Sequence, residues 1–355
     1  MKSTRILNKQ SISSLQLYKL MKAYFALAFG LSILLSSCVS YDKIVAEHSI
    51  IRVGPGPEDF VFDMEGINPR LIVSCAERRK KAYPKFSEFW EINLNDDQAR
   101  IIPHIGLPDS IRLHAHGIDI GVTVHGKTLF VVNHEVEKDY ERQSVLLFKV
   151  FKDSLVFKDL LINPDSLVSP NDVCFDGING LFISNDAKKR GARLQQILTS
   201  SSYVLHVDLK TREWSKPVKD LVYANGVGVN KGKLYVSGVG EKGVKVLEPK
   251  DGSWTRMDTL GYFKGADNIM FYDNELYTTT HPSLLKFIGH VGDNRKNSPG
   301  QIFRADLKNG RTEMIYEDDG SLMSAPSTAF RYNESIYVAQ VFRPYILKLP
   351  LPKSN

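Results

Sequence analysis

The stretch from 224 to 238, ANGVGVNKGKLYVSG, contains the unit on which the fold depends. A polar pair, Asn225-Gly226, comes first and is followed by an apolar run, a turn signal and a second run rich in aromatic and β-branched residues. This order of features is typical of two antiparallel strands joined by a turn. The stretch therefore predicts a pair of strands with a polar pair at the start of the first.

Five other segments repeat this order, and each begins with a short polar stretch. These stretches are Pro57-Glu58-Asp59, His116-Gly117-Ile118, Asn171-Asp172, Asp267-Asn268 and Ser327-Thr328. The second strand begins nine or ten residues after the polar stretch in four segments, and thirteen residues after it in the first two, where the turn is longer. Self-similarity at roughly 40 to 60 residues predicts an all-β chain that folds as a six-bladed β-propeller with four strands per blade.

The two ends of the repeat array are expected to meet in one blade. Outer fourth strands can be recognised in five blades, but none follows the last third strand, YILKLPL at 345–351. The segment 48–53, HSIIRV, precedes the first blade just as ARIIP at 99–103 precedes the second. We therefore expect an N-terminal strand to complete the last blade of a propeller that occupies residues 49–355, because this pairing removes an exposed sheet edge.

Three insertions interrupt the repeats. They are rich in Lys, Arg, Gly and Asn and lie at 76–88, 186–202 and 288–299. We expect irregular loops there, which either cover the active face or are simply solvated.

The composition is that of a globular chain, with 43% hydrophobic and 24% charged residues among 355. The formal net charge of +6 is concentrated at the N-terminus, where five basic residues and no acidic residue precede position 38. Without those five, 41 basic residues face 40 acidic ones. The basic excess therefore gives no support to nucleic-acid binding.

The N-terminal residues have the features of a targeting segment. Residues 22–38, KAYFALAFGLSILLSSC, place a lysine before an apolar run and small residues before Cys38. This pattern predicts a signal peptide over 1–37, with a possible true start at Met21, and it is too short for an ordinary membrane span. Leu35-Ser36-Ser37-Cys38 resembles a bacterial lipobox, so we expect lipidation of Cys38, a tether over 38–48, and export to the periplasmic or cell-surface side of a bacterial membrane. The alternative is a cleaved secretory signal with an incidental cysteine.

The remaining cysteines, Cys75 and Cys174, lie in strand-like runs, LIVSC and VCFD. We expect buried small hydrophobic residues at both positions, although an oxidising compartment would permit them to pair. GxSxG, GxGxxG, P-loop and CxxC motifs are absent from the sequence. Serine-hydrolase, nucleotide-binding and zinc-cluster functions therefore have no support.

Polar side chains should gather at one end of the propeller channel, because the first strand of every blade lines it. The expected ring contains Glu58, Asp59, Asn171, Asp172, Asn225, Asp267 and Asn268. Carboxylates and amides packed in one narrow channel would repel each other and lack hydrogen bonds unless a cation lay among them, and oxygen ligands favour calcium. The alternative is that each Asn or Asp only caps a turn.

Three histidines lie at positions of the repeat that are expected near the same end of the channel. His116 belongs to the ring, His134 ends the next strand of the same blade, and His281 is at the corresponding end of the fifth blade. We expect all three near the channel mouth. His114 and His125 have no such positional argument and are expected in surface or loop positions.

These residues resemble the paraoxonase and arylesterase family. The resemblance extends over about residues 54–349 and depends on GPEDF, HAHGI, LFVVNH, NDV, ANGV, ADNI, the HP pair at 281–282, and APST. It implies a six-bladed propeller with two calcium ions in its channel. The family's terminal disulfide has no counterpart, because no cysteine follows Cys174.

Carried over by motif, the resemblance implies three groups of site residues. The implied ligands of a catalytic calcium are Glu58, Asn171, Asn225, Asp267 and Asn268. The implied ligands of a structural calcium are Asp59, Asp172 and the main-chain carbonyl of Ile118. His116 and His134 match the family's proposed histidine dyad.

The resulting hypothesis is a monomeric, calcium-dependent hydrolase of lactones and aryl esters. Calcium would polarise the carbonyl, and His116, oriented by His134, would activate water. Asp267 or Glu58 could be the base instead. Two other functions remain open at this point: a cell-surface binding propeller with purely structural calcium, and a gluconolactonase-like sugar lactonase. The expected partners are a small ester or lactone and, through the lipid anchor, the membrane.

Overall fold

The computed structural model describes residues 40–44, 46–65, 68–79, 86–137, 140–188, 199–251 and 253–352. The predicted signal peptide and Cys38 lie outside the described residues. Among the residues that are described, no helix is both long and apolar enough to cross a membrane.

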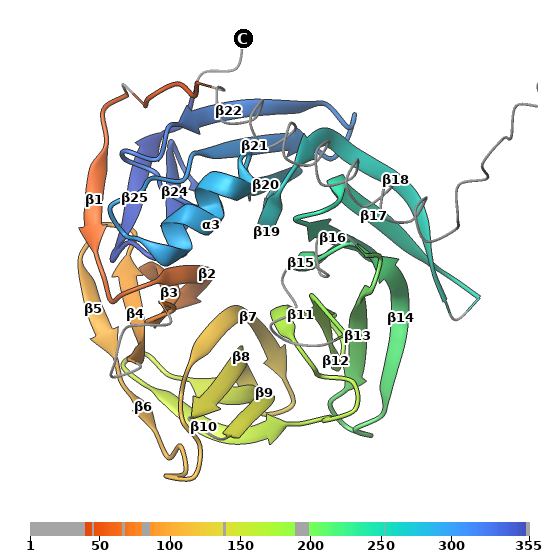
Figure 1. Cartoon of the computed structure of the whole chain (residues 1–355). Helices are drawn as coiled ribbons and strands as arrows, with labels where there is room; N and C mark the ends of the chain where they lie inside the picture. The colour runs from red at the N-terminus through yellow and green to blue at the C-terminus, as the bar shows by residue number, and fades with distance from the viewer. Residues whose placement is uncertain are drawn as a thin grey trace, which may run out of the picture. The chain divides into compact units, whose positions relative to one another are not determined.

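Six antiparallel sheets are arranged in a ring, which confirms the predicted six-bladed propeller (Figure 1). The first three blades contain β2 (Pro57–Glu65), β3 (Asn68–Ala76), β4 (Ser87–Asn93) and β5 (Ala99–Ile102); β7 (Ala115–Thr123), β8 (Gly126–Glu137), β9 (Tyr140–Val150) and β10 (Leu155–Leu161); and β11 (Pro170–Phe175), β12 (Gly180–Asn185), β13 (Ser202–Asp208) and β14 (Trp214–Leu221). The last three contain β15 (Ala224–Asn230), β16 (Lys233–Gly238), β17 (Lys242–Lys250) and β18 (Ser253–Lys264); β19 (Ala266–Tyr272), β20 (Glu275–Thr280), β21 (Gly300–Asp306) and β22 (Thr312–Asp318); and β23 (Pro326–Tyr332), β24 (Ser335–Gln340), β25 (Tyr345–Pro350) and β1 (Ser49–Arg52).

The ring closes as predicted. Strand β1 pairs antiparallel with β25, from Ser49 opposite Lys348 to Arg52 opposite Tyr345. The second blade has an addition that the repeat pattern did not predict, because the short strand β6 (His104–Ile105) pairs in parallel with β10.

Hydrophobic side chains fill the spaces between neighbouring blades. In the cluster shared by the first two blades, Phe89 of β4 lies 5.6 Å from Phe148 of β9 between ring centroids, at 69°. Both rings are fully buried. Truncating such a ring to alanine typically costs about 3–5 kcal/mol. Cys75 and Cys174 are buried free thiols, which confirms that they are small core residues.

The six polar stretches are structurally equivalent. Each innermost strand has a one-residue shift in register at its polar stretch, between Pro57 and Asp59, Ala115 and Ile118, Pro170 and Val173, Ala224 and Val227, Ala266 and Ile269, and Pro326 and Ala329. Such a β-bulge changes the direction of side chains that would otherwise alternate between faces. It explains how two consecutive residues, such as Glu58 and Asp59, can both be turned towards the channel.

A second repeated feature brings the second strands to the same end of the channel. In four blades the residue after the second strand donates its backbone N–H to a carbonyl just before the innermost strand. In the first blade the donor is the last residue of β3, and in the second blade it is His134, which lies inside β8. The six pairs are Ala76 with Gly56, His134 with His114, Asp186 with Ser169, Val239 with Tyr223, His281 with Gly265, and Val341 with Ala325. Gly56 and Gly265 have positive φ angles, and a Cβ there would lie 2.2 Å and 2.5 Å from backbone oxygens. His134 and His281 therefore occupy equivalent positions.

One insertion differs from the prediction. Helix α3 (Leu284–Gly292) includes the first part of the segment 288–299, where an irregular loop was predicted. Ser283 begins the helix as its N-cap and accepts a hydrogen bond from Lys286 N–H. An N-cap followed by apolar residues at helical spacing stabilises even a short helix when one face packs against the domain. Figure 1 shows α3 on the face of the ring towards the viewer, above the fifth and sixth blades.

Candidate calcium and catalytic site

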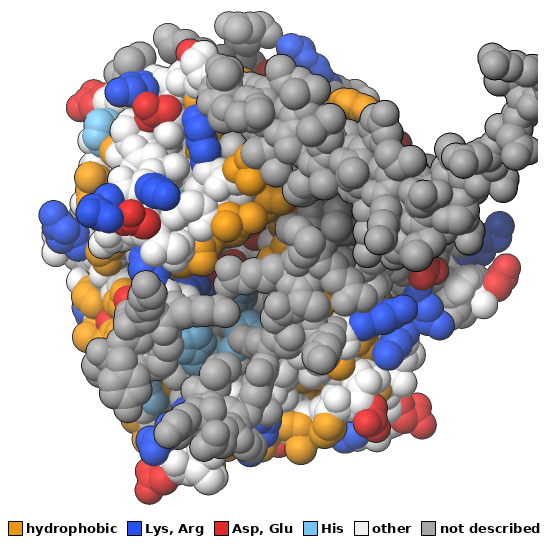
Figure 2. All heavy atoms as spheres, in the orientation of Figure 1, with side chains coloured by type: hydrophobic (Ala, Val, Ile, Leu, Met, Phe, Trp, Pro, Cys, Tyr) orange, Lys and Arg blue, Asp and Glu red, His pale blue; other side chains and the backbone are white. Residues whose placement is uncertain are grey.

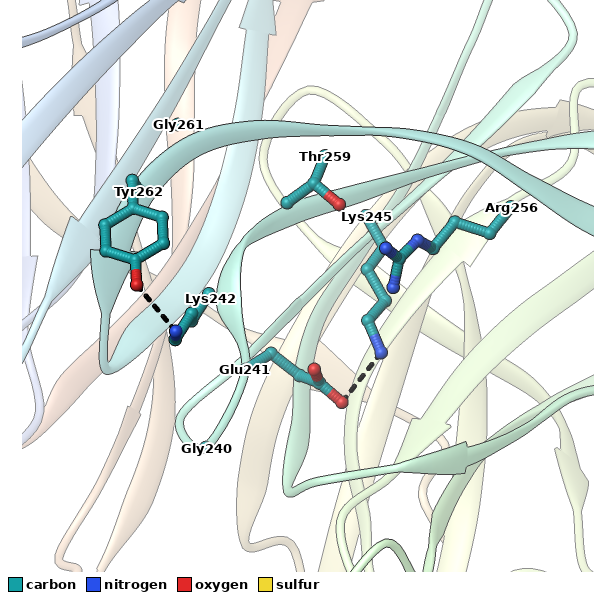
Figure 3. Close-up of a pocket in the computed structure, with 8 residues that line it drawn as sticks. All are labelled: Gly240, Glu241, Lys242, Lys245, Arg256, Thr259, Gly261 and Tyr262. Atoms are coloured by element: carbon teal, nitrogen blue, oxygen red, sulfur yellow. Dashed lines mark hydrogen bonds and ion pairs between the residues drawn. The ribbon is translucent and has the colours of Figure 1, made fainter.

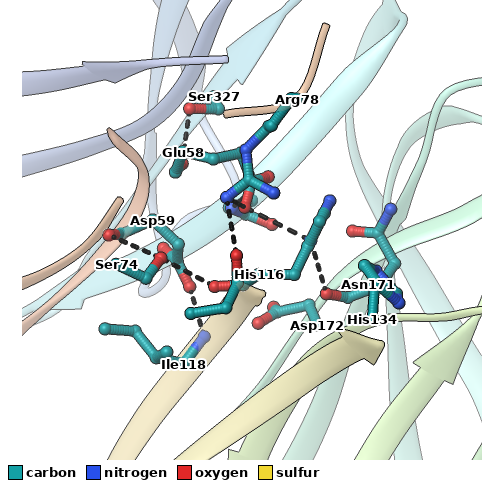
Figure 4. Close-up of polar contacts among 12 residues, drawn as sticks. Glu58, Asp59, Ser74, Arg78, His116, Ile118, His134, Asn171, Asp172 and Ser327 are labelled. Carbon is teal, nitrogen blue, oxygen red and sulfur yellow. Dashed lines mark hydrogen bonds and ion pairs between the residues drawn. The ribbon is translucent and has the colours of Figure 1, made fainter. Parts of the chain in front are cut away.

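The structure brings all seven predicted ring residues into the interior. Their exposed fractions range from 2% for Asn268 to 7% for Asn171. They come from β2, β11, β15 and β19, while β23 contributes the fully buried Ser327 and Thr328. Figure 4 shows Glu58, Asp59, Asn171 and Asp172 around the side chain of His116. The spacing of the repeats was therefore sufficient to identify the polar centre of the propeller.

Five ring oxygens have no hydrogen-bond partner among the described residues. They are Glu58 Oε2, Asn171 Oδ1, Asn225 Oδ1, Asp267 Oδ1 and Asn268 Oδ1, and all are buried. A buried acceptor without a donor costs about 1–3 kcal/mol, so native proteins rarely leave five together. A cation with oxygen ligands would satisfy all five at once, and these five residues are the ones implied as ligands of a catalytic calcium.

The chemistry of this set also fits calcium rather than a transition metal. Within the described ranges, no three His, Cys, Asp or Glu side chains form a cluster suited to a metal ion. Here two carboxylates are combined with three amides, and hard oxygen ligands of this mixed kind are suited to calcium. The donor set therefore supports an oxygen-bound cation and does not resemble a zinc site.

Glu58 is the most constrained carboxylate in the ring. Its Oε2 lies 3.3 Å from His116 Nδ1 and 3.8 Å from Arg78 Nη2, and its Oε1 accepts a 3.4 Å hydrogen bond from Asn268 Nδ2. Burial raises the pKa of Glu58 well above its usual range, Arg78 opposes this rise, and the neighbouring Asp267 adds to it. A carboxylate in these surroundings needs positive charge nearby to stay ionised.

Asp59 and Asp172 differ from that set because backbone N–H groups already satisfy them. Asp59 Oδ2 accepts from Ile118 N–H at 2.8 Å, and Asp172 Oδ2 accepts from Val227 N–H at 2.8 Å. Each contact joins two blades. Burial raises the pKa of Asp59 to about 7 and, together with repulsion from Asp59, the pKa of Asp172 well above its usual range. The negative charge of Asp59 and Asp172 therefore favours a second cation. Unlike the five residues above, these two carboxylates have no oxygen that lacks a hydrogen-bond partner.

The predicted histidine dyad is present as a pair of rings. His116 and His134 lie 4.8 Å apart between ring centroids, at 69°. His116 Nδ1 is 3.0 Å from the carbonyl oxygen of Asn171, and His134 Nδ1 is 2.5 Å from Gln143 Oε1. Because both partners are acceptors, a neutral ring must carry its proton on Nδ1, which leaves Nε2 as the basic nitrogen. Figure 2 shows histidine side chains gathered in the central hollow over the second blade.

His281, from the fifth blade, contacts the ring directly. Its Nε2 is 2.7 Å from Asp267 Oδ2, and both side chains are almost fully buried. The ring of Phe287, from helix α3, packs on the imidazole with 4.5 Å between centroids. Equivalent positions in two blades thus each place a histidine beside a ring residue, as the sequence predicted. The strand of His134 was predicted to end there, but β8 continues to Glu137, because its last residues still pair with β9. His125 is exposed, as expected, whereas His114 is half-buried and its Nε2 lies 3.1 Å from the carbonyl oxygen of Glu77.

Sequence reasoning missed a set of hydroxyl groups that supports the bulges. Ser74 Oγ donates to His116 O at 2.7 Å, Thr279 Oγ1 donates to Ser327 O at 2.8 Å, and Ser237 Oγ donates to Asp267 O. Each hydroxyl comes from a second strand and reaches a polar stretch of the next blade. In the sequence, these hydroxyls appear as a Ser or Thr near the end of LIVSC, LYVSG and LYTTT. This shared position becomes visible only when the six blades are aligned with each other.

A pocket of about 550 Å³ lies away from the ring, on the third and fourth strands of the fourth blade (Figure 3). Its basic side chains are largely paired, because Lys242 Nζ lies 2.6 Å from Tyr262 OH and Lys245 Nζ lies 2.8 Å from Glu241 Oε1. None of the predicted site residues lines it. The ring, and not this pocket, is therefore the candidate site.

Comparisons with known proteins agree with this geometry. Human serum paraoxonase/lactonase 3 is 23% identical over 273 residues, which cover 71% of this chain and 73% of the human protein. Among solved structures, the soluble aldose sugar dehydrogenase of Escherichia coli superposes with a TM-score of 0.53 at 12% identity, over 86% of this chain and all of that one. The nidogen/laminin complex matches with a TM-score of 0.52 at 11% identity, over 79% of this chain and 89% of that chain. At such identities these two structures show the shared fold alone.

The match to a family model is decisive. The arylesterase model matches residues 84–347, well over half of the chain, and the matched region includes the bulges of the last five blades. The chain belongs to the arylesterase family.

Proposed function

We propose that this protein is a calcium-dependent hydrolase of lactones and aryl esters. The observation that carries the proposal is a set of five buried oxygens without hydrogen-bond partners on four channel-lining strands, in a chain of the arylesterase family. One of them, Glu58 Oε2, lies 3.3 Å from His116 Nδ1. The similarity to a human protein named as a lactonase favours lactones as one substrate class.

In this proposal the ring residues bind two calcium ions. Glu58, Asn171, Asn225, Asp267 and Asn268 would hold the catalytic calcium, and Asp59, Asp172 and the carbonyl of Ile118 would hold the structural one. A bound calcium supplies a Lewis acid that polarises the ester carbonyl and stabilises negative charge on its oxygen.

His116 is the base in the proposed reaction. Its Nε2 takes a proton from water, the water oxygen forms a bond to the acyl carbon, and the acyl carbon–oxygen bond breaks. The same nitrogen returns the proton to the leaving alkoxide, so a lactone becomes a hydroxy acid and an aryl ester becomes an acid and a phenol. The carbonyl of Asn171 fixes the His116 ring through Nδ1, 3.0 Å away, so that Nε2 can act.

His134 and Gln143 have positioning roles. Gln143 Oε1 accepts from His134 Nδ1, which fixes the tautomer of His134 beside His116. Asp267 is a ligand and His281 holds its second oxygen in place. Positioning partners of this kind commonly matter 10- to 100-fold for metal affinity or activity.

The N-terminal segment adds a proposal about location. We propose export as a monomeric lipoprotein anchored through Cys38, because residues 22–38 combine a short apolar run with a lipobox-like end. Labelled fatty acid should be incorporated into the parent protein and not into a Cys38→Ser variant.

A substrate screen tests the proposed activity. Lactones, aryl esters and phosphotriesters are offered to the purified protein with calcium and again after chelation. Hydrolysis of a lactone or aryl ester that requires calcium is the expected result. An absence of hydrolysis in every class would favour a binding propeller, and activity that survives full removal of calcium would exclude the mechanism.

A further inference from the structure

Arg78 places a positive charge at the edge of the ring. The residue follows β3, and its side chain is 8% exposed. Its Nη2 donates to the carbonyl oxygen of Ala115 at 3.0 Å and lies 3.8 Å from Glu58 Oε2 (Figure 4). Among the described residues, no other lysine or arginine forms an ion pair with a ring carboxylate.

The guanidinium has donating capacity that the protein does not use. Arg78 Nε is buried and has no acceptor in the described part of the chain. Its distance to Glu58 is too long for a hydrogen bond, so the carboxylate does not consume the other donors either. A buried donor without an acceptor needs an explanation in the same way as the five unpaired oxygens do. A cation would satisfy the five unpaired oxygens, whereas an anion would satisfy the unpaired Nε of Arg78.

The loop fixes Arg78 in position by contacts on both sides. Glu77 N–H donates to Phe86 O at 2.8 Å, and the Glu77 carbonyl lies 3.1 Å from His114 Nε2. Arg79 Nη1 donates to the carbonyl of Val291 at the end of helix α3 at 3.3 Å. These contacts hold the loop on both sides of Arg78, and the guanidinium itself is held by its hydrogen bond to the carbonyl of Ala115. A donor held in advance by its neighbours loses little entropy when a ligand binds.

Arg78 and His116 are both near the same oxygen of Glu58. Glu58 Oε2 is 3.3 Å from His116 Nδ1 and 3.8 Å from Arg78 Nη2. A substrate whose carbonyl is within reach of His116 would thus place a substituent a few bonds away next to the guanidinium.

We propose that Arg78 makes the site selective for lactones and esters that carry a free carboxylate a few bonds from the reactive carbonyl. This inference depends on the proposed hydrolase function. Arginine is suited to the role because its planar donors match both oxygens of a carboxylate. Arg78 acts as a specificity residue that contacts the substrate and takes no part in proton transfer.

A matched pair of substrates tests this selectivity. One is a five-membered lactone that bears a carboxylate, and the other is the same lactone with a carboxamide in its place. The readout is the ratio of their kcat/KM values in the parent and in Arg78→Met and Arg78→Lys. We expect the parent to favour the carboxylate about 10- to 100-fold, the range for a hydrogen bond to a charged group. Arg78→Met should lose this preference, and Arg78→Lys should recover part of it.

Arg295→Met is the charge control, because it removes the same charge from a side chain that is 86% exposed and pairs with Asp293. Its substrate ratio should equal that of the parent. Equal ratios in the parent and Arg78→Met would overturn the proposal. A similar loss in Arg295→Met would also overturn it, by showing an effect of net charge alone.

A binding measurement separates this inference from the proposed function. Calorimetry follows the carboxylate lactone's ring-opened product, a hydroxy dicarboxylate, as it binds to calcium-loaded parent and Arg78→Met, after calcium affinity has been measured for both. At least tenfold weaker product binding in the variant, with calcium still bound, supports Arg78 as the carboxylate ligand. If the parent binds the product in this way but hydrolyses no lactone, the hydrolase proposal fails and the anion site remains. Equal affinities would overturn the anion site.

Discussion

His281 Nε2 lies 2.7 Å from Asp267 Oδ2, and both residues belong to the fifth blade. This contact leaves Asp267 Oδ1 as the oxygen without a partner. The imidazole thereby determines which carboxylate oxygen is available to a cation.

The first prediction concerns this pair. His281→Gln should weaken calcium binding or turnover by about 10- to 100-fold, because Asp267 would lose the partner that orients it. A second pair provides the control: His206 Nε2 lies 3.1 Å from Asp176 Oδ2, outside the ring. His206→Gln should leave both quantities at the parental level. Calorimetric titration and lactone hydrolysis measure the two effects, and identical behaviour of the two variants would contradict the role of His281.

The second prediction concerns ring closure. A chain that begins at Pro55 lacks β1, so the sixth blade loses its outer strand and β25 becomes an exposed edge. Its free energy of unfolding should fall by several kcal/mol relative to a chain that begins at Ser49. The chain that begins at Ser49 loses only minor contacts, such as the hydrogen bond from Ile44 N–H to Asp318. Equal denaturation midpoints for the two chains would show that strand pairing does not close the propeller.

The third prediction separates the two groups of ring residues. Asp59→Ala should destabilise the protein even in chelator, by about 1–3 kcal/mol, because Ile118 N–H and Phe60 N–H lose their side-chain acceptor. Asn225→Ala removes a buried oxygen that has no donor, so its chelated midpoint should not fall below the parent's. With calcium present, Asn225→Ala should lose turnover. Thermal denaturation with and without chelator tests both statements, and the reverse pattern would mean that the two sets of ligands are exchanged.

The fourth prediction concerns the base. His116→Gln keeps approximate size and hydrogen-bonding capacity but removes proton transfer, so kcat should fall by roughly 10²- to 10⁴-fold with calcium affinity unchanged. His134→Gln should cost less, because that ring only positions its neighbour. His125→Gln, at an exposed hairpin turn, is the control that should be silent. If His116→Gln keeps its rate while Asp267→Asn loses it with calcium bound, a ring carboxylate is the base.

The sequence predicted those features that depend on repetition. Asn225 and Asp267 were assigned to the ring because each precedes the second strand of its segment by the same nine residues, and the structure places both inside. The bulge beside each of them was not predicted, because a shift in register depends on two strands at once. Arg78 was missed for a related reason: its position at Glu58 depends on a loop that follows no repeat.

Helix α3 shows a different limit. Leu284, Phe287 and Ile288 have helical spacing after Ser283, so a signal existed. It was too short to stand out from the strand pattern around it, and packing of Phe287 on His281 contributes to the stability of the helix in the fold. Tertiary packing, not intrinsic propensity, commonly decides such short helices.

The central claim is that the five unpaired oxygens hold a calcium ion that catalysis requires. Calorimetric titration of the fully chelated protein with calcium tests it most directly, with the parent compared with an Asn225→Ala, Asn268→Ala double variant. The account predicts two bound ions per chain in the parent, one in the double variant, and lactone hydrolysis that returns only as the second ion binds to the parent. A double variant that binds calcium with the parental stoichiometry and affinity, or a parent that binds none, would contradict the account.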